Sequence, residues 1–219
     1  MGFLDTILGV IFPENCLSCG TSETPLCTTC LTSFPQAERE CAKWINPLFD
    51  YRHEPVKSAL WRLKYKGQKR LARVFGEVLY PRMLEELADL LVMENFREPV
   101  LVPIPLSSKR YRERGFNQAD LICRKLVELD QENKEKNFKL EEDILVRPRE
   151  SEHQARIEDR KKRLANIVGA FSVKNPKVIE NKNIILIDDI ITTGATLSEA
   201  RKVLRAAGAR KVIAFTIAH

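Results

Sequence analysis

The sequence predicts an α/β fold built on a parallel sheet, and three neighbouring segments carry that prediction. Residues 184–187 are four consecutive apolar residues, mostly β-branched, which is typical of a central strand covered on both faces. A helix follows, because apolar residues recur at helical spacing up to Gly208, a residue that ends helices. Residues 211–217 form another apolar strand, so the three segments make a βαβ unit.

The preceding chain is expected to supply more of the same domain. Residues 48–65 predict a strand and then a helix, and residues 74–91 predict an amphipathic helix interrupted at Pro81. Residues 100–105 read as the first core strand, which ends at prolines because proline cannot extend a strand ladder. We place this α/β domain at residues 45–219.

Two further segments follow that strand. A helix is predicted over residues 117–129 from its apolar periodicity. Residues 130–143 are polar and of mixed charge, which predicts a solvent-exposed excursion.

Residues 1–44 are predicted to form a separate small module, with a short N-terminal helix and a metal site. Its cysteines follow the pattern CxxC, seven residues, CxxC, at Cys16, Cys19, Cys27 and Cys30. Four thiolates in tetrahedral geometry suit Zn²⁺, and a site with four protein ligands is structural, since it leaves no open position. Disulfides are the alternative; a chain without an export signal favours zinc.

The run IILIDDIITTGATL contains the chemistry of a ligand site. Asp188 and Asp189 emerge at the carboxyl end of the predicted strand, which is the edge where open α/β sheets bind ligands. Adjacent carboxylates accept hydrogen bonds from the vicinal hydroxyls of a ribose and offer charge to a divalent cation. The small and hydroxyl residues that follow suit a phosphate group, which the helix N-terminus would also favour: Thr192, Thr193, Gly194, Ala195 and Thr196.

Other classes are excluded or disfavoured. The sequence has no GxxxxGK[ST] for a nucleotide P-loop and no GxGxxG that opens a helix after a strand. No apolar stretch approaches the ~18 residues of a membrane helix. With no export signal, we expect the protein in the cytoplasm.

The net charge of +6 is clustered near aromatic residues. One group lies beside Trp61 and Tyr65 and contains Lys64, Lys66, Lys69, Arg70 and Arg73; a second lies beside Tyr111 and Phe116 and contains Lys109, Arg110, Arg112 and Arg114; a third spans residues 160–163. Binders of single-stranded nucleic acid combine cations with stacking rings. Solvated faces, or cations directed at a pyrophosphate, are the alternatives.

Residues 184–196 resemble the motif with which type I phosphoribosyltransferases bind 5-phosphoribosyl 1-pyrophosphate (PRPP). The resemblance extends over nearly the whole chain to the ComF family of competence-associated, phosphoribosyltransferase-like proteins. It includes the four-cysteine segment, residues 64–67, residues 101–105 and residues 112–118, and also Arg147, Gln154, Arg163, Asn166 and residues 169–171. Extra cysteines found in many relatives are missing, apart from Cys41, so a second metal site is not expected.

The resemblance implies a type I phosphoribosyltransferase core preceded by a zinc-binding module. It further implies that Asp188 and Asp189 bind the ribose hydroxyls, that residues 192–196 hold the 5′-phosphate, and that Mg²⁺ accompanies PRPP. Lys109 and Arg110, in a loop after Pro105, would meet the pyrophosphate, and residues 147–166, with Arg147 and Arg163, would form a mobile loop over the site. Characterised relatives act in DNA uptake during natural transformation, alongside a helicase-like ATPase.

Three functions stay open at this point. The chain is a competence factor that binds PRPP and single-stranded DNA, an enzyme that transfers phosphoribose to an acceptor, or a PRPP sensor that signals to a partner. No acceptor pocket and no catalytic residue can be identified from the residues.

Overall fold

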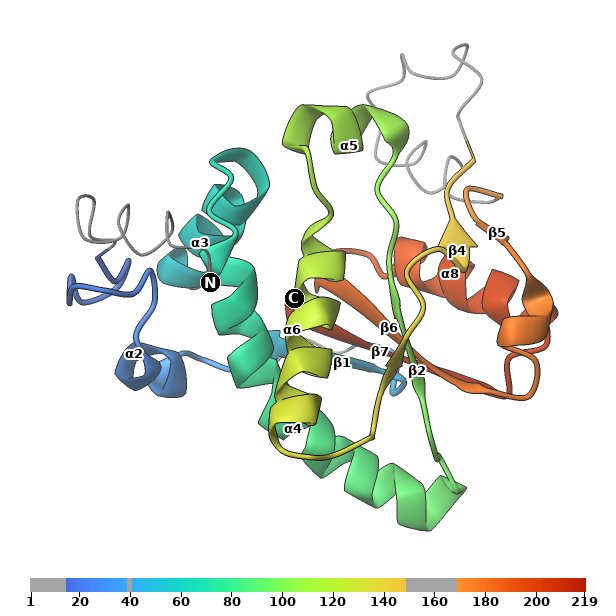
Figure 1. Ribbon diagram of the computed structural model, residues 1–219. Coiled ribbons are helices and arrows are strands. Elements are labelled where there is room, and N and C mark those ends of the chain that lie inside the picture. The colour runs from blue at the N-terminus through green and yellow to red at the C-terminus, as the bar shows by residue number, and fades with distance from the viewer. Residues whose placement is uncertain (1–14, 39–40, 149–168) are drawn as a thin grey trace.

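A computed structural model describes residues 15–38, 41–148 and 169–219. Within them, five parallel strands form a sheet in the order β1-β7-β6-β2-β3 (Figure 1). The strands are β1 (Ile45–Phe49), β2 (Val100–Pro103), β3 (Lys139–Leu140), β6 (Asn183–Ile190) and β7 (Lys211–Ala218). Because all neighbouring strands are parallel, their carboxyl ends lie along one edge, and the predicted α/β parallel-sheet class is confirmed.

Helices cover both faces of the sheet (Figure 1). On one face lie α3 (Glu54–Tyr65), α4 (Arg70–Glu94) and α6 (Gln118–Glu132), and on the other lies α8 (Ala195–Ala206). The shorter elements are α2 (Thr28–Ser33), α5 (Ser108–Arg114), the 3-10 helix η2 (Pro176–Val178), and the antiparallel pair β4 (Leu145–Val146) and β5 (Ser172–Val173).

Strand β6 is buried on both sides, as its continuous apolar run predicts. Ile185 and Ile187 pack toward α3, α4 and α6, whereas Ile184 and Leu186 pack toward α8, and all four side chains are fully buried. The alternation follows from the two-residue period of a strand. Parallel pairing of β6 with β7 across α8 confirms the predicted βαβ unit.

Three local predictions need correction. Helix α4 is not interrupted at Pro81 but continues through it, because the buried neighbours Leu79, Tyr80 and Met83 hold the helix against the core despite the lost hydrogen bond. Residues 108–114 are helical rather than a loop. The polar segment 130–143 contributes β3 to the sheet and buries Phe138, so it is only partly a solvent-exposed excursion.

The cysteine-bearing segment packs against the larger domain. Leu26, Leu31 and Phe34 belong to the same hydrophobic cluster as α3 and α4, and the Asp50 amide donates to the Pro35 carbonyl at 2.9 Å. The boundary at residues 44/45 stays a prediction. The helix predicted at the N-terminus lies outside the described residues.

Candidate functional site

The two adjacent acids lie at the carboxyl end of the central strand β6. Asp188 pairs in register with Thr216 of β7, and Asp189 is buried. The Asp189 amide donates to Asp188 Oδ1 at 2.8 Å, which fixes the Asp188 carboxylate beside the backbone. Two carboxylates are therefore held at successive positions of β6, at the edge of the sheet where ligands bind.

Their environment makes Asp188 unusually basic for a carboxylate. Burial, and next the negative charge of Asp189, raise the pKa of Asp188 to about 7. The Asp189 amide and the positive charges of Lys64 and Arg110 act in the opposite direction. Near neutral pH, Asp188 can therefore both accept and release a proton.

Lys64 brings a cation to this acidic pair from a distant part of the chain. Its Nζ lies 2.8 Å from Asp189 Oδ1, with side-chain exposures of 15% and 9% for the two residues. Lys64 is in the last turn of α3, whose inner face is fully buried. The nucleic-acid cluster predicted from the sequence included Lys64, but in the folded chain its ammonium group lies with the carboxylates.

The turn after β6 leads directly into α8. The Ile191 amide donates to the Ala218 carbonyl at 2.9 Å, which anchors the start of the turn. Gly194 has φ of +72°, a left-handed conformation that glycine adopts without strain. The Ala195 amide, the first of α8, donates to Thr193 Oγ1 at 3.4 Å, a long bond that an anion could replace. Thr192 and Thr193 are exposed beside this helix N-terminus, which favours an anion.

Helix α5 rises from the same edge of the sheet (Figure 1). The Ile104 amide donates to the Ile187 carbonyl at 2.9 Å, and Asn117 Nδ2 donates to the Ile104 carbonyl at 3.0 Å. These bonds hold both ends of the α5 segment beside the acidic pair. Lys109 and Arg110, predicted to meet pyrophosphate, are exposed on α5.

The other predicted loop cations are only partly described. The Arg147 guanidinium lies 5.7 Å from the centroid of the Phe171 ring, just beyond β4. Arg163 lies outside the described residues, as does most of the predicted mobile loop.

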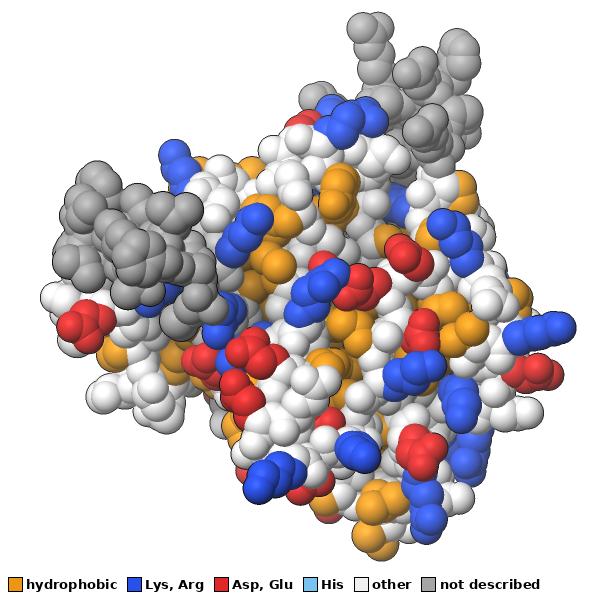
Figure 2. Space-filling view, in the orientation of Figure 1, with side chains coloured by type: hydrophobic (Ala, Val, Ile, Leu, Met, Phe, Trp, Pro, Cys, Tyr) orange, Lys and Arg blue, Asp and Glu red, His pale blue; other side chains and the backbone are white. Residues whose placement is uncertain are grey.

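The first two basic clusters come together through their aromatic residues. Arg114 lies 5.2 Å from the Tyr65 ring centroid, Lys66 Nζ lies 5.4 Å from that of Trp61, and Trp61 and Tyr65 are 6.0 Å apart. Both rings are about half exposed or more, at 49% for Trp61 and 61% for Tyr65. We call Trp61, Tyr65, Lys66, Lys69 and Arg114 the aromatic–basic surface; Figure 2 shows basic and hydrophobic side chains interleaved on this part of the molecule.

Lys69 belongs to the aromatic–basic surface, and two other cations of these clusters, Arg112 and Arg70, lie around it. Lys69 Nζ is 5.0 Å from the Phe116 ring centroid, which joins the start of α4 to the end of α5. Arg112 is exposed on α5. Arg70 donates to the Glu23 carbonyl at 3.1 Å and so ties α4 to the cysteine-bearing segment.

The four cysteines converge as the spacing predicts. The Sγ atoms of Cys16, Cys19, Cys27 and Cys30 all lie within 4.8 Å of one another, and Cys19 and Cys27 are 3.6 Å apart. A tetrahedral zinc site with Zn–S bonds of ~2.3 Å requires sulfurs about 3.8 Å apart, so the donor set fits that metal. The Thr21 hydroxyl lowers the pKa of Cys19 to about 6, favouring the thiolate that binds metals.

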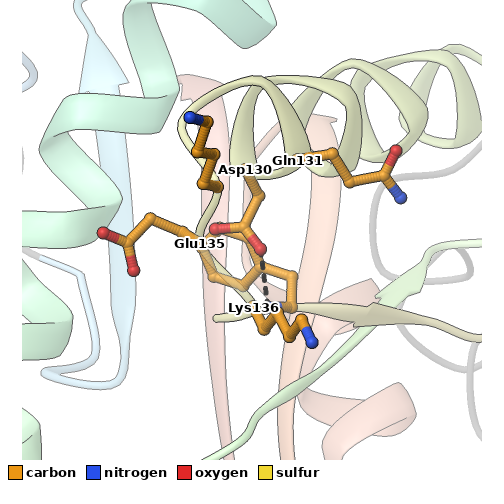
Figure 3. Close-up of a pocket in the computed structure, with 6 residues that line it drawn as sticks. Asp130, Gln131, Glu135 and Lys136 are labelled. Carbon is orange, nitrogen blue, oxygen red and sulfur yellow. Dashed lines mark hydrogen bonds between the residues drawn. The ribbon is translucent and has the colours of Figure 1, made fainter.

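The residues around a pocket at Asp130 have a structural role (Figure 3). The Asp130 carboxylate accepts hydrogen bonds from the Asn137 amide at 2.8 Å, the Phe138 amide at 3.3 Å and the Tyr80 hydroxyl at 3.2 Å. These bonds hold the turn before β3 in place. Because β3 pairs with the first residues of β2, the pocket lies at the amino edge of the sheet, opposite the acidic pair.

Comparison with known proteins identifies the family. Residues 126–219 match the model of the phosphoribosyl transferase domain. The chain is 32% identical over 221 residues to "Competence protein ComFC" of Streptococcus pneumoniae, covering 97% of this chain and 84% of that protein. The chain belongs to the ComF family. It is 33% identical over 166 residues to the Bacillus subtilis protein of the same name, covering 75% of this chain and 60% of that protein.

A third similar protein is named for DNA utilization rather than for competence. The chain is 25% identical over 200 residues to "DNA utilization protein YhgH" of Escherichia coli K12, covering 90% of this chain and 80% of that protein. It is thus a competence-related, phosphoribosyltransferase-like protein. Within the described residues, no helix has both the length and the apolar character needed to cross a membrane.

The sequence of this ComF-family chain did not predict that Lys64 lies beside Asp189. The motif around residues 184–196 contains no basic residue, and Lys64 belongs to a run of cations typical of a surface. A signal was nevertheless present: Leu60 and Leu63 place the buried face of α3 next to Lys64, so this lysine lies at the border of the core.

Proposed function

We propose that this chain binds PRPP together with Mg²⁺ through the β6–α8 turn and takes part in DNA uptake during natural transformation. The ligand is inferred from one observation: two carboxylates at the carboxyl end of the central strand are followed by a glycine turn and by the N-terminus of α8. The vicinal hydroxyls and the phosphate of a ribose 5-phosphate match the chemistry of these two groups of partners.

In this proposal each residue has a defined role. Asp188 and Asp189 accept hydrogen bonds from the ribose hydroxyls, and residues 192–196 bind the 5′-phosphate with their amides and hydroxyls. Lys109 and Arg110 on α5 attract the pyrophosphate. Mg²⁺, when bound with PRPP, supplies charge neutralisation at the pyrophosphate and retains several waters. Zn²⁺ held by the four cysteines stabilises the N-terminal segment that packs against α3 and α4.

The role in DNA uptake rests on the aromatic–basic surface and on the names of the relatives. Exposed rings beside cations bind single strands, since the rings stack on bases and the cations follow the phosphates. Trp61, Tyr65, Lys66, Lys69 and Arg114 provide both groups on one surface. Relatives named for competence and for DNA utilization support a DNA-related role for this chain.

PRPP binding is tested by calorimetric titration in the presence and absence of Mg²⁺. We expect the wild-type protein to bind with Mg²⁺, and the double variant Asp188→Asn with Asp189→Asn to lose binding by at least about 100-fold, since both ionised acceptors are removed. The variant Asp143→Asn serves as a matched control on an acid outside the site. Absence of binding at millimolar PRPP in the wild-type protein would overturn the ligand proposal.

Enzymatic transfer of phosphoribose is the second candidate, and the pKa of Asp188 favours it. A carboxylate with a pKa of about 7 can take a proton from an acceptor near neutral pH. The measurement is release of pyrophosphate from PRPP when candidate nitrogen acceptors are added. Turnover that disappears in Asp188→Asn while PRPP still binds supports the enzyme, and no release with any acceptor favours the binding role alone.

A further inference from the structure

The ion pair between Lys64 and Asp189 lies mostly inside the folded protein. Both side chains are mostly buried, and the distance of 2.8 Å allows a hydrogen bond as well as charge attraction. The position of Lys64 is set by the core, because Ala59, Leu60 and Leu63 of the same helix are fully buried. Burial and fixed position distinguish this pair from an exposed salt bridge, which contributes little.

The acidic pair needs such a cation when no ligand is bound. Two neighbouring carboxylates that are withdrawn from water repel each other, and their charged forms are disfavoured by burial. Arg110 and Lys64 both oppose this effect at Asp188, but only Lys64 is in direct contact with the pair among the ion pairs of the described residues. Lys64 thus occupies one of the oxygens that a ribose hydroxyl or a metal would use.

We propose that Lys64 is the internal counter-ion of the PRPP site and leaves Asp189 when the ligand binds. In the free protein its ammonium group holds the Asp189 carboxylate in place. When a ribose reaches the acidic pair, its hydroxyls take over Asp189 Oδ1, and the released ammonium is free to meet an oxygen of the phosphates. This inference rests on the proposed function, since the ligand that displaces Lys64 is PRPP.

The positive charge of Lys64 should weaken the binding of a cation at the acidic pair and strengthen the binding of an anion. A free divalent cation competes with Lys64 for the carboxylates, so removal of the lysine charge should tighten metal binding. PRPP is an anion and is attracted by the same charge, so its binding should weaken. A lysine that only stabilised the fold would leave both affinities unchanged or weaken both.

The experiment compares Lys64→Met with the wild-type protein as a zinc-loaded full chain. Binding of Mn²⁺ alone is followed by electron paramagnetic resonance, and binding of PRPP at one fixed, saturating Mg²⁺ concentration is followed by calorimetry. We expect the Mn²⁺ Kd to fall about tenfold or more and the PRPP Kd to rise about tenfold or more. The matched control is Lys57→Met, because Lys57 is on the same helix but forms an exposed pair with Glu54, and it should change neither affinity.

A second measurement uses the unmodified sequence, in case Lys64→Met does not fold. The 15N resonance of the Lys64 ammonium group, assigned by its loss in Lys64→Arg, should shift when PRPP and Mg²⁺ are added. Unchanged Mn²⁺ and PRPP affinities in a folded Lys64→Met, or an unchanged ammonium resonance in ligand-saturated protein, would overturn the inference. If the wild-type protein binds no PRPP, the proposed function fails separately, and the Mn²⁺ comparison still decides whether Lys64 is the counter-ion.

Discussion

The guanidinium of Arg114 lies 5.2 Å from the centroid of the Tyr65 ring and joins the end of α5 to the end of α3. The Arg114 guanidinium also donates to Gln118 Oε1 at 2.9 Å, which holds it at the start of α6. Two basic clusters that are separate in the sequence therefore form one surface. Lys64, on the inner side of α3, connects that helix to the acidic pair.

We expect loss of the Tyr65 ring to weaken binding of single-stranded DNA. In Tyr65→Ala, affinity for an unstructured oligonucleotide should fall by about 1–3 kcal/mol, the contribution of one stacked base. The dependence on salt should stay unchanged, because no charge is removed. Fluorescence anisotropy at several salt concentrations measures both quantities.

Loss of the surface cations should instead change the salt dependence of single-stranded DNA binding. The double variant Lys66→Gln with Lys69→Gln should reduce the slope of log K against log salt by about 1.4, at ~0.7 for each phosphate contact with a single strand. Exposed Lys57, on the outer part of α3, provides the control Lys57→Gln, which should keep the slope. An unchanged slope in the double variant would remove these lysines from the interface.

Replacement of one cluster cysteine should release the metal. In Cys27→Ser, zinc content should fall from about one ion per chain to near zero, and the contacts of Leu26, Leu31 and Phe34 with the core should loosen. Metal analysis and near-ultraviolet circular dichroism provide the measurements. Cys41→Ser is the control, because Cys41 Sγ donates to the Ile45 carbonyl and is not part of the cluster; zinc loss in both variants alike would contradict the four-cysteine site.

The raised pKa of Asp188 predicts how stability depends on pH. The folded state binds this proton more tightly than the unfolded chain, in which the pKa is 3.8. The stability that the group contributes is therefore fully present below about pH 4 and is lost as pH rises through about 7. Asparagine binds no proton, so Asp188→Asn should not show this loss.

The measurement is denaturant unfolding of both proteins between about pH 4 and pH 9. The stability of Asp188→Asn relative to wild type should rise across that range by up to about 4 kcal/mol, at 1.36 kcal/mol for each pKa unit. Titrating groups that do not interact with Asp188 cancel in the difference. A difference that does not vary with pH would show that the Asp188 pKa is not raised in the folded protein.

A methyl group added at Gly76 should destabilise the contact between α4 and α6. A Cβ at this position would lie 2.9 Å from Cβ and Cγ of Lys125, a side chain that is 5% exposed and cannot easily move. Alanine favours a helix over glycine by about 1 kcal/mol, but overpacking costs about 1–3 kcal/mol. We expect Gly76→Ala to be less stable than wild type in thermal unfolding; a more stable variant would mean that α6 shifts away without cost.

Much of the fold was predictable because the local patterns of apolar residues favour the same helices and strands that the folded chain contains. The continuous apolar run of residues 184–187 identified a strand buried on both faces, and helical periodicity up to Gly208 identified α8. Prolines and polar segments were less informative. Helix α4 continues through Pro81, and residues 139–140 pair with β2. In both cases, burial elsewhere in the element outweighs the local preference against a helix or a strand.

The sequence by itself determined the class of the sheet, the place of Asp188 and Asp189 at its carboxyl edge, and the four-cysteine cluster, because each depends on the order and spacing of a few adjacent residues. Only the tertiary structure decided that Lys64 faces Asp189 and that Tyr65 meets Arg114. Those contacts depend on how α3 and α5 pack beside β6, and no local spacing encodes the distance between elements so far apart in the chain.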